Sequence, residues 1–510
     1  MLTLLPLLPT AFAQDVQLTE STWVFHGDQA RAYASPSYTP VGDLNGDGYG
    51  DAAVVVARNE MTENEVYVYM GGPAGLDEFP SWTRHYENSP LGGFLINGGD
   101  VNGDGYSDLV LTAGFSNAAG FDAGQVDLFL GSAAGPSESV NWSVTGPEYS
   151  ALGIATAIGD VNADGYADIL LGAGYDYSSG PEGGSAYLYL GSAVGPGPTP
   201  AWSYTVTQEH TDFGWGASYL GDVNGDGYGD VAIGALLYDN GNTDEGRVYV
   251  FHGRASGLRT TPARTLEVNQ DNAWFGAVTK GADVNGDGYG DLLTGAYAYD
   301  NGSVDEGRAY AWYGGPTGIP TSPAWVVDGN QEGCQFGSST NPVGDVNGDG
   351  YADVFSAGAG CSSDGIMTDG VGGLYLGSED GLSPYAALTL SGGQDNAWFG
   401  WAVGAGDVNG DGYDDFLISG TDIDDGEEDE GEVRLYLGGV PETLDLGTED
   451  TGGGGMMAMF GPEEDVHTAG DLLLDEADSG GGCNTAPGGV ELLSALVGLG
   501  GMLLRRRARV

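Results

Sequence analysis

Short apolar runs separated by glycine-rich and polar turns follow one another along most of the chain. Some runs are continuous, as in residues 52–56 and 231–233, and others alternate apolar with polar residues, as in residues 247–251. Continuous runs this short predict strands buried on both faces, and alternation predicts strands with one face more exposed. No helical period accompanies them, so the pattern predicts an all-β chain.

A further strand signature carries a tryptophan and recurs through the same region. It stands at Trp23, Trp82, Trp142, Trp202 and Trp325, and residues 265–268 and 387–390 replace it in two units. Each unit then holds about four strands in about 60 residues, which suits a β-propeller blade. Because one blade cannot bury both of its faces, neighbouring blades must stack. We expect a seven-bladed β-propeller of four-stranded blades over residues 14–440.

The order of the signatures also predicts how the ring closes. Trp23-Val24-Phe25 precedes the first complete unit, whereas the last unit ends at residues 437–439 with no such strand after it. We therefore expect residues 23–25 to supply the outer strand of the seventh blade.

A nine-residue loop, first seen at residues 43–51, returns six times at intervals of 57 to 62 residues. Each copy has Asp at positions 1, 5 and 9, Asn at 3, Gly at 6 and Tyr at 7, and one copy has Ala163 at position 4. Oxygen ligands without His or Cys suit a hard cation, and a flexible loop suits Ca²⁺ better than Mg²⁺. The pattern predicts about seven Ca²⁺ sites.

Other interpretations of this loop fit less well. An EF-hand needs an acid at position 12, where Val54, Leu111 and Ile233 stand in three of the copies. A dockerin would show two copies, each backed by a helix. Plain Asx turns need no metal, but three converging carboxylates without a cation would repel one another in every copy.

The net charge of -60 limits the classes of partner that this 510-residue chain can bind. Part of the 74 acids lie in the seven loops, and the others predict a solvated acidic surface. Such a surface argues against nucleic acid and against direct docking on anionic lipid. A hydrophobic content of 41% excludes a disordered chain. Lys280 is the one lysine.

The motifs together resemble the FG-GAP repeat of integrin α-subunit propellers and their bacterial relatives, over residues 20–440. Phe-Gly pairs at 213, 275, 336 and 399 precede the loop, and Gly-Ala ends the strand that follows it. The first two units depart from this, with Ala34-Ser35 and Gly92-Gly93. All seven units carry the loop, unlike integrins, so the ligand-binding properties of integrins do not transfer.

The resemblance implies Ca²⁺ ligands at positions 1, 3, 5 and 9 and at the carbonyl of position 7. These are Asp43, Asn45, Asp47, Tyr49, Asp51, Asp100, Asn102, Asp104, Tyr106, Asp108, Asp160, Asn162, Asp164, Tyr166, Asp168, Asp222, Asn224, Asp226, Tyr228, Asp230, Asp283, Asn285, Asp287, Tyr289, Asp291, Asp345, Asn347, Asp349, Tyr351, Asp353, Asp407, Asn409, Asp411, Tyr413 and Asp415.

The two ends of the chain differ from the repeats. Residues 1–13 are apolar with an Ala-x-Ala cleavage site, which predicts a signal peptide, with a buried segment as the alternative. Residues 441–482 are acidic and glycine-rich, as in a flexible linker. Residues 483–510, with Cys483, an apolar stretch and terminal arginines, resemble a MYXO-CTERM sorting tag. That resemblance implies a sorting protease acting near Cys483; a retained tail anchor is the alternative.

Cys334 and Cys361 lie on either side of the sixth loop. In an exported protein they favour a disulfide that pins this blade, and two buried free thiols are the alternative.

These features favour an exported, surface-displayed calcium-binding module for adhesion or scaffolding. Its partner would be a protein or glycan held by variable loops such as residues 238–245 and 299–302. A propeller-based polysaccharide lyase or hydrolase, or a purely structural surface component, is the alternative. The five histidines form no clustered motif, so we expect no enzyme.

Overall fold

The structure, a computed structural model, describes residues 16, 18–36, 40–58, 63–87, 94–176, 183–363 and 365–440. The predicted signal peptide, the acidic linker and the C-terminal tag lie outside these residues. The described part is all-β, as the patterning predicts. It contains no helix of the length and apolarity that crossing a membrane requires.

The strands are β1 (Thr19–His26), β2 (Ser35–Pro36), β3 (Ala52–Arg58), β4 (Glu63–Tyr69), β5 (Trp82–Tyr86), β6 (Phe94–Gly99), β7 (Asp108–Ala113), β8 (Gln125–Phe129), β9 (Trp142–Thr145), β10 (Leu152–Gly159), β11 (Asp168–Ala173), β12 (Ser185–Tyr189), β13 (Trp202–Thr205), β14 (Phe213–Gly221), β15 (Asp230–Ala235), β16 (Arg247–Phe251), β17 (Arg264–Leu266), β18 (Phe275–Ala282), β19 (Asp291–Ala296), β20 (Arg308–Trp312), β21 (Trp325–Asp328), β22 (Ser339–Gly344), β23 (Asp353–Gly358), β24 (Val371–Tyr375), β25 (Leu388–Ser391), β26 (Phe399–Gly406), β27 (Asp415–Gly420) and β28 (Glu432–Leu437).

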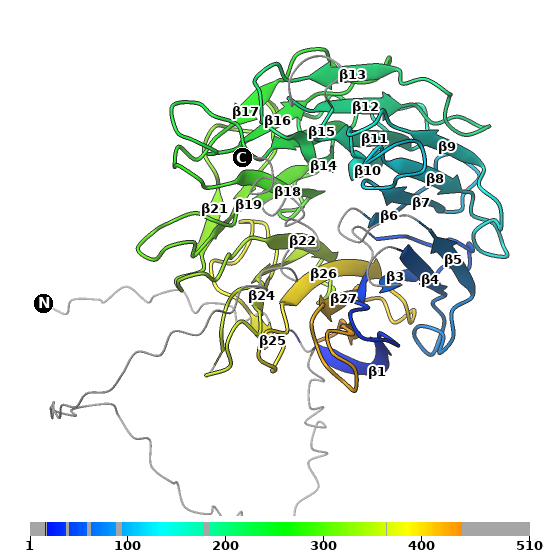
Figure 1. The fold of residues 1–510 in the computed structure, drawn as a ribbon, viewed down its shortest axis with the longest axis vertical. Helices are drawn as coiled ribbons and strands as arrows, with labels where there is room; N and C mark the ends of the chain where they lie inside the picture. Colours follow the sequence, from blue (N-terminus) through cyan, green and yellow to red (C-terminus); the bar gives the residue numbers. More distant parts are fainter. Residues whose placement is uncertain are drawn as a thin grey trace, which may run out of the picture. The chain divides into compact units, whose positions relative to one another are not determined.

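These strands form seven four-stranded antiparallel sheets that stand around one axis, so the predicted seven-bladed β-propeller is confirmed (Figure 1). Within a blade the sheet order follows the chain, from an inner strand such as β14 to an outer strand such as β17. The exception is the seventh blade, whose order is β26, β27, β28 and then β1.

The N-terminal strand closes the ring as predicted. β1 pairs antiparallel with β28, with Val24 opposite Arg434 and Phe25 opposite Val433. The first and last blades are therefore held together by one sheet rather than by side-chain packing alone.

The core is divided among the interfaces between blades. One apolar cluster fills each of the seven interfaces, including the one between the seventh and first blades. The second strand of each blade is consequently buried on both faces, as all six residues of β15 show. Burial of apolar surface contributes about 25 cal/mol per Å², so blade stacking is the main source of stability.

The recurrent outer-strand tryptophans link each blade to the next. The indole N–H of Trp202 donates to the carbonyl of Arg259 at 3.0 Å, and that of Trp23 donates to Asp77 across the closing interface at 3.0 Å. In the fourth blade, which lacks the tryptophan, Nε of Arg264 makes the equivalent bond to Ile319 at 2.8 Å. The signature is therefore explained by a buried ring with one polar group at its edge.

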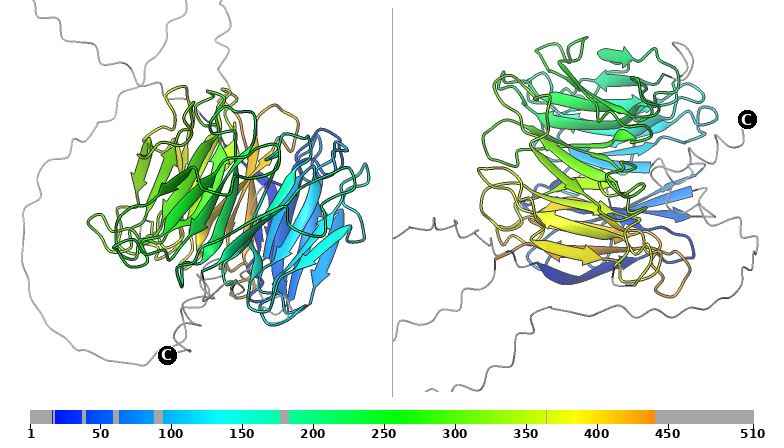
Figure 2. Two further views of the ribbon diagram at one scale, coloured as in Figure 1. Left: turned by 90° about the horizontal axis from the view of Figure 1, so that it is seen from above. Right: turned by 90° about the vertical axis from the view of Figure 1, so that its left-hand side faces the viewer.

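The ring has two distinct ends, and loops project from both in the side views of Figure 2. We call one the metal-loop end; it holds the nine-residue loops and the turns between third and fourth strands. The other, the opposite end, holds the loops between second and third strands and the connections between blades. Alternation of antiparallel strands fixes this division.

Two local features bear on the sequence predictions. Cys334 and Cys361 form a disulfide in the sixth blade, which confirms the bridge. In the first blade, which lacks the Phe-Gly pair, the described part of the inner strand is Ser35–Pro36, which pairs with Val55 and Val54 of β3.

Candidate metal centres

Each nine-residue loop connects the first strand of a blade to the second. In the fourth blade Asp222 directly follows β14 and Asp230 is the first residue of β15. The seven loops therefore lie at equivalent places around the metal-loop end, and the structure brings the predicted ligands of each loop into one tight turn.

Backbone N–H groups orient the side-chain oxygens of the loop. Asp222 accepts from Asp226 N at 3.2 Å and from Gly227 N at 2.6 Å. Asn224 Oδ1 accepts from Asp226 N at 2.9 Å, and Asp226 Oδ1 accepts from Tyr228 N at 3.2 Å. The bond from the fifth residue to the first recurs in all seven copies. The rotamers at positions 1, 3 and 5 are thus fixed by the fold.

The ninth residue has a second role. Asp230 Oδ2 accepts from Val223 N at 3.0 Å, and Oδ1 accepts from Gly253 N at 2.8 Å. Gly253 lies in the turn after β16, so this carboxylate joins the loop to a turn 23 residues further along. All seven equivalents are at most 1% exposed. A carboxylate has about four acceptor positions, so two are left for a cation.

The ninth aspartates are also the most perturbed acids of the loops. Burial is the largest cause of their raised pKa; the facing aspartates at positions 1 and 5 raise it further, and the two backbone N–H groups lower it. The pKa is raised to about 6 at Asp51 and Asp108, to about 7 at Asp168, Asp230, Asp291 and Asp415, and to about 8 at Asp353. A cation in the loop would favour the ionised form.

The three carboxylates of a loop stand farther apart than in a closed metal cluster. Among the described residues, one group of His, Cys, Asp and Glu side chains has all its ligand atoms within 4.8 Å: His26, Asp425 and Glu430, in the seventh blade. The His26 group joins residues some 400 positions apart, so no sequence pattern indicates it.

The donor set of the loops fits calcium. It consists of carboxylate, amide and carbonyl oxygens without nitrogen or sulfur, on a turn that is held by hydrogen bonds but open to solvent at positions 4 to 6. A bound ion would cross-link the exposed half of the loop to the buried ninth aspartate.

Neighbouring loops are interlocked. A Cβ atom on Gly410 would lie 2.6 Å from the ring of Tyr49 in the next blade, so only glycine allows this close approach. Gly50 N also donates to Asp407 O at 2.9 Å. Equivalent inter-blade bonds are donated by Ser107, Ala167, Gly290 and Asp414. These bonds link five of the seven neighbouring pairs of loops, so those loops are not structurally independent.

A set of glutamines at the opposite end was missed from the sequence. Gln270 Nε2 donates to Asp300 O at 2.8 Å, and Gln270 Oε1 accepts from Asp300 N at 2.7 Å. The same paired bonds are made by Gln208, Gln331 and Gln394. Each glutamine stands five residues before the Phe of a Phe-Gly pair, and this constant spacing was the available signal.

The loops between second and third strands carry exposed apolar side chains among polar ones. Phe121, in the second blade's loop of this class, is 47% exposed, and Tyr149, in the connection between β9 and β10, is 39% exposed. Their ring centroids are 5.4 Å apart, and Tyr149 N donates to Phe121 O at 2.7 Å. Val304 and Met367, in the same class of loop, are also exposed. Singly exposed apolar residues are ordinary, but a paired aromatic surface is typical of contact sites.

Comparison with known proteins identifies the repeats. Residues 93–129, 152–189, 213–251 and 275–312 match the FG-GAP repeat, and residues 345–418 match the FG-GAP-like repeat. These segments omit the first blade.

Relatives include several integrin α-subunits. Integrin alpha-V of Gallus gallus is 31% identical over 44% of this chain, integrin alpha-5 of Xenopus laevis is 33% identical over 31%, and human integrin alpha-IIb is 36% identical over 30%. The alignments span 22%, 16% and 16% of those proteins, respectively. This chain therefore spans less than a quarter of the length of these relatives.

Proposed function

Because the chain is an integrin-alpha-like β-propeller built from FG-GAP repeats, we propose that it is an exported calcium-binding module for adhesion or scaffolding. The observation that carries this proposal is the difference between the two ends of the ring. One end is occupied by interlocked metal loops, whereas the opposite end presents variable polar loops with the Phe121–Tyr149 pair. Binding proteins commonly carry recognition on loops that a rigid scaffold positions.

Calcium is the proposed brace of this scaffold. The ion would offset the repulsion among three aspartates in each loop and hold the loop against the turn that the ninth aspartate contacts. The chain's own residues supply the shape, since backbone N–H groups already orient Asp222, Asn224 and Asp226. An extracellular setting supplies enough Ca²⁺ for weak sites.

The proposed partner is a protein or a glycan, and the proposed role is not enzymatic. Aromatic side chains with polar neighbours suit either partner, because a ring offers a large contact area at a small cost in conformational entropy. The histidines of the described part are spread over several blades, with His26 in β1 and His85 in β5. They offer no shared general base.

The test uses the full chain in Ca²⁺ buffer on immobilised arrays of purified glycans and extracellular proteins. We expect binding that is lost in a Phe121→Ala/Tyr149→Ala variant and retained in a Phe79→Ala/Tyr385→Ala variant. The second pair is also exposed but lies at the metal-loop end, so it controls for a general loss of surface aromatics.

Two outcomes would contradict the proposal. If only the Phe79→Ala/Tyr385→Ala variant lost binding, recognition would lie at the metal-loop end rather than at the opposite end. Self-association of the chain without binding to any probe would favour a purely structural surface component.

A further inference from the structure

The His26 group lies where the N-terminal strand leaves the closed ring. His26 is the last residue of β1, and Asp425 and Glu430 lie in the loop between β27 and β28 at the opposite end. One ligand atom from each of the three side chains lies within 4.8 Å of the other two. The group is therefore separate from the nine-residue loops, and it joins two segments that meet only when the ring closes.

The ligand atoms of this group are close to metal-binding geometry. His26 Nδ1 lies 3.4 Å from Asp425 Oδ2. Two ligands that are each about 2.1 Å from a tetrahedral ion stand about 3.4 Å apart. Glu430 is 4% exposed, and its Oε1 accepts from Asp425 N at 2.6 Å, which fixes the buried carboxylate. The side chains of His26 and Asp425 are exposed, so they can close on an ion that Glu430 holds from below.

The surroundings of His26 carry an excess of negative charge. Glu432 lies opposite His26 in the sheet and is 6% exposed, and its Oε2 is 3.6 Å from His26 Nδ1. Arg434 pairs with Glu432. Three carboxylates, those of Asp425, Glu430 and Glu432, thus lie around one imidazole and one guanidinium. Even with the imidazole protonated, this set keeps a negative charge, and converging carboxylates repel one another.

The fourth and fifth blades have an arginine at the equivalent place. In the fifth blade Arg308 follows an Asp-Glu-Gly triplet and pairs with Asp328, which lies opposite it in the outer strand. Asn301 Nδ2 donates to the same carboxylate at 3.2 Å. The fourth blade makes the same contacts with Arg247, Glu267 and Asn240. A guanidinium therefore neutralises this part of both blades.

The seventh blade differs at all three of these positions. Glu432 follows the Asp-Glu-Gly triplet in place of arginine, His26 stands opposite it in place of the acid, and Asp425 replaces the asparagine. The changes remove the guanidinium and the neutral amide, and they bring an imidazole and a second carboxylate. The positive charge lost with the arginine is what a divalent ion would supply.

We propose that the His26 group binds a divalent transition-metal ion, best matched by Zn²⁺, through His26, Asp425 and Glu430. An imidazole nitrogen together with carboxylates is a ligand set for zinc, whereas calcium takes oxygen ligands. Three protein ligands leave the fourth position of a tetrahedral ion to water. The ion clamps the closing strand to the seventh blade, because one ligand comes from β1 and two come from the loop before β28. This site adds to the proposed calcium sites and does not depend on them.

The test is a calorimetric titration of the full chain with ZnCl₂ in saturating Ca²⁺. We expect one Zn²⁺ per chain that His26→Ala abolishes, and a rise in melting temperature with Zn²⁺ that this variant lacks, since an ion bound to the folded state stabilises it. In the ¹⁵N-histidine-labelled protein, Zn²⁺ should shift the Nδ1 signal of one histidine, the one missing from His26→Ala.

His85→Ala is the matched control. His85 is also exposed on an outer strand, β5, and its Nε2 lies 3.3 Å from Glu63 Oε2. Among the described residues it belongs to no group of three converging ligands. This variant should bind Zn²⁺ with the wild-type stoichiometry and affinity.

A second variant gives the seventh blade the arrangement of the fifth. His26→Asp/Asp425→Asn/Glu432→Arg restores the arginine, the facing acid and the asparagine that Arg308, Asp328 and Asn301 provide. We expect it to fold, to melt at least as high as the metal-free wild type, and to bind no Zn²⁺ at this place. It therefore tests the site even if His26→Ala fails to fold.

Several results would overturn the proposal. These are the absence of a Zn²⁺ site that depends on His26, an equal loss of Zn²⁺ in His85→Ala, and an unchanged Zn²⁺ stoichiometry in the triple variant. Displacement of the ion by equimolar Ca²⁺ would also overturn it, since an imidazole ligand should favour zinc over calcium.

Discussion

At the scale of single residues, the loop aspartates fall into two structural classes, although the repeated sequence does not distinguish them. Asp226, at position 5, is partly exposed and is held by the loop's own backbone. Asp230, at position 9, is buried and accepts N–H groups from two separate segments. The first class is available to the proposed cation, and the second also holds the blade together.

This difference predicts unequal effects of alanine substitution. Asp226→Ala should remove one Ca²⁺ site and leave stability in chelator nearly unchanged. Asp230→Ala should lower the free energy of unfolding by about 2–4 kcal/mol even in chelator, because two buried N–H groups lose their acceptor. Urea unfolding with and without EDTA measures both. Equal losses in chelator would contradict the structural role of Asp230.

The raised pKa values of the ninth aspartates predict an inverted pH dependence for the metal-free protein. Their pKa rises from 3.8 to between about 6 and about 8 in the folded state. Folding therefore favours the protonated form, and this contribution is complete below the unfolded pKa and is lost as pH rises through the folded pKa. We expect the melting temperature in chelator to fall between about pH 4 and pH 8.

Calcium provides the control for that titration, since it favours the ionised carboxylates. With Ca²⁺ present, melting should not fall over the same range. If the melting temperature of the metal-free protein instead rose toward pH 8, groups other than the ninth aspartates would dominate the pH dependence of its stability.

At the scale of elements, strand β1 closes the ring as the outer strand of the seventh blade. It occupies the edge of the seventh blade and packs Trp23 against Tyr69 of the first blade, with centroids 5.1 Å apart. Removing it would expose both the edge of β28 and one blade interface.

Deletion of residues 14–26 should therefore destabilise the whole ring, seen as a large drop in melting temperature. A synthetic peptide of residues 16–27, added in trans, should restore much of it by strand addition. A scrambled peptide of the same composition is the control. A deletion variant that melts like the wild type would refute the closure model.

Prediction from sequence succeeded for elements whose signals repeat. Trp23 could be assigned to the seventh blade because the same signature occurs in four of the other outer strands, and Asp43 could be assigned to a loop because six copies follow it. The constant spacing of Gln270 and its equivalents was equally visible, but its meaning depends on contact with Asp300 in a different loop.

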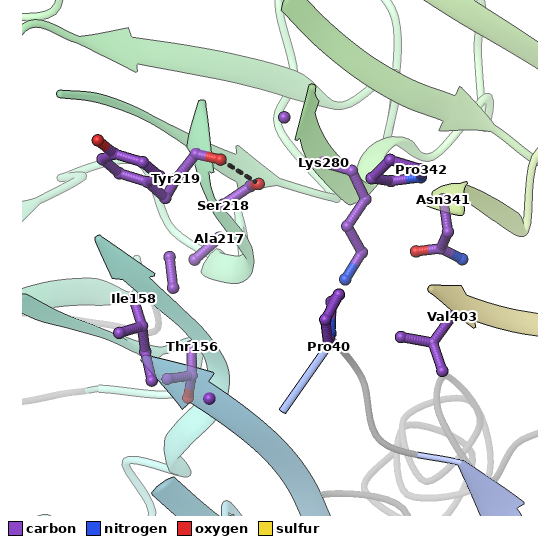
Figure 3. Close-up of a pocket in the computed structure, with 13 residues that line it drawn as sticks. Pro40, Thr156, Ile158, Ala217, Ser218, Tyr219, Lys280, Asn341, Pro342 and Val403 are labelled. Atoms are coloured by element: carbon purple, nitrogen blue, oxygen red, sulfur yellow. Dashed lines mark hydrogen bonds between the residues drawn. The ribbon is translucent and has the colours of Figure 1, made fainter. Parts of the chain in front are cut away.

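A cavity among the inner strands, lined by residues from all seven blades, lay beyond such reasoning (Figure 3). Lys280, Thr156 and Asn341 come from three blades, and they stand three or four residues before a loop. No local pattern shows that these positions face one another. The bond that Gly253 N donates to Asp230 is similar, since the loop sequence by itself gives no sign of the distant turn.

At the scale of the whole molecule, the interlocked loops predict coupled calcium binding. Gly50 donates to Asp407 across the closing interface, so each site borders two others. Calorimetric titration of the full chain should give near seven ions, with melting temperature rising at each step. Asp226→Ala should remove one ion and weaken mainly the adjacent sites.

Two results of that titration would contradict the proposal that calcium braces the ring. Zero or one ion per chain would mean that most loops hold no metal. Loss of every site in Asp226→Ala would mean that the blades do not couple through neighbours alone. High salt is a useful comparison, because screening should relieve repulsion in a chain of net charge -60 without filling any loop.

The pairing of β1 with β28 has a consequence for synthesis on the ribosome. Strand β1 cannot pair until β28 has been made, because Val24 meets Arg434 only after more than 400 further residues have been translated. Early blades can stack as they appear, yet the two open flanks stay unprotected until the end. We expect nascent chains truncated before β28 to be sensitive to protease and to recruit chaperones, whereas the completed ring becomes resistant in one late step.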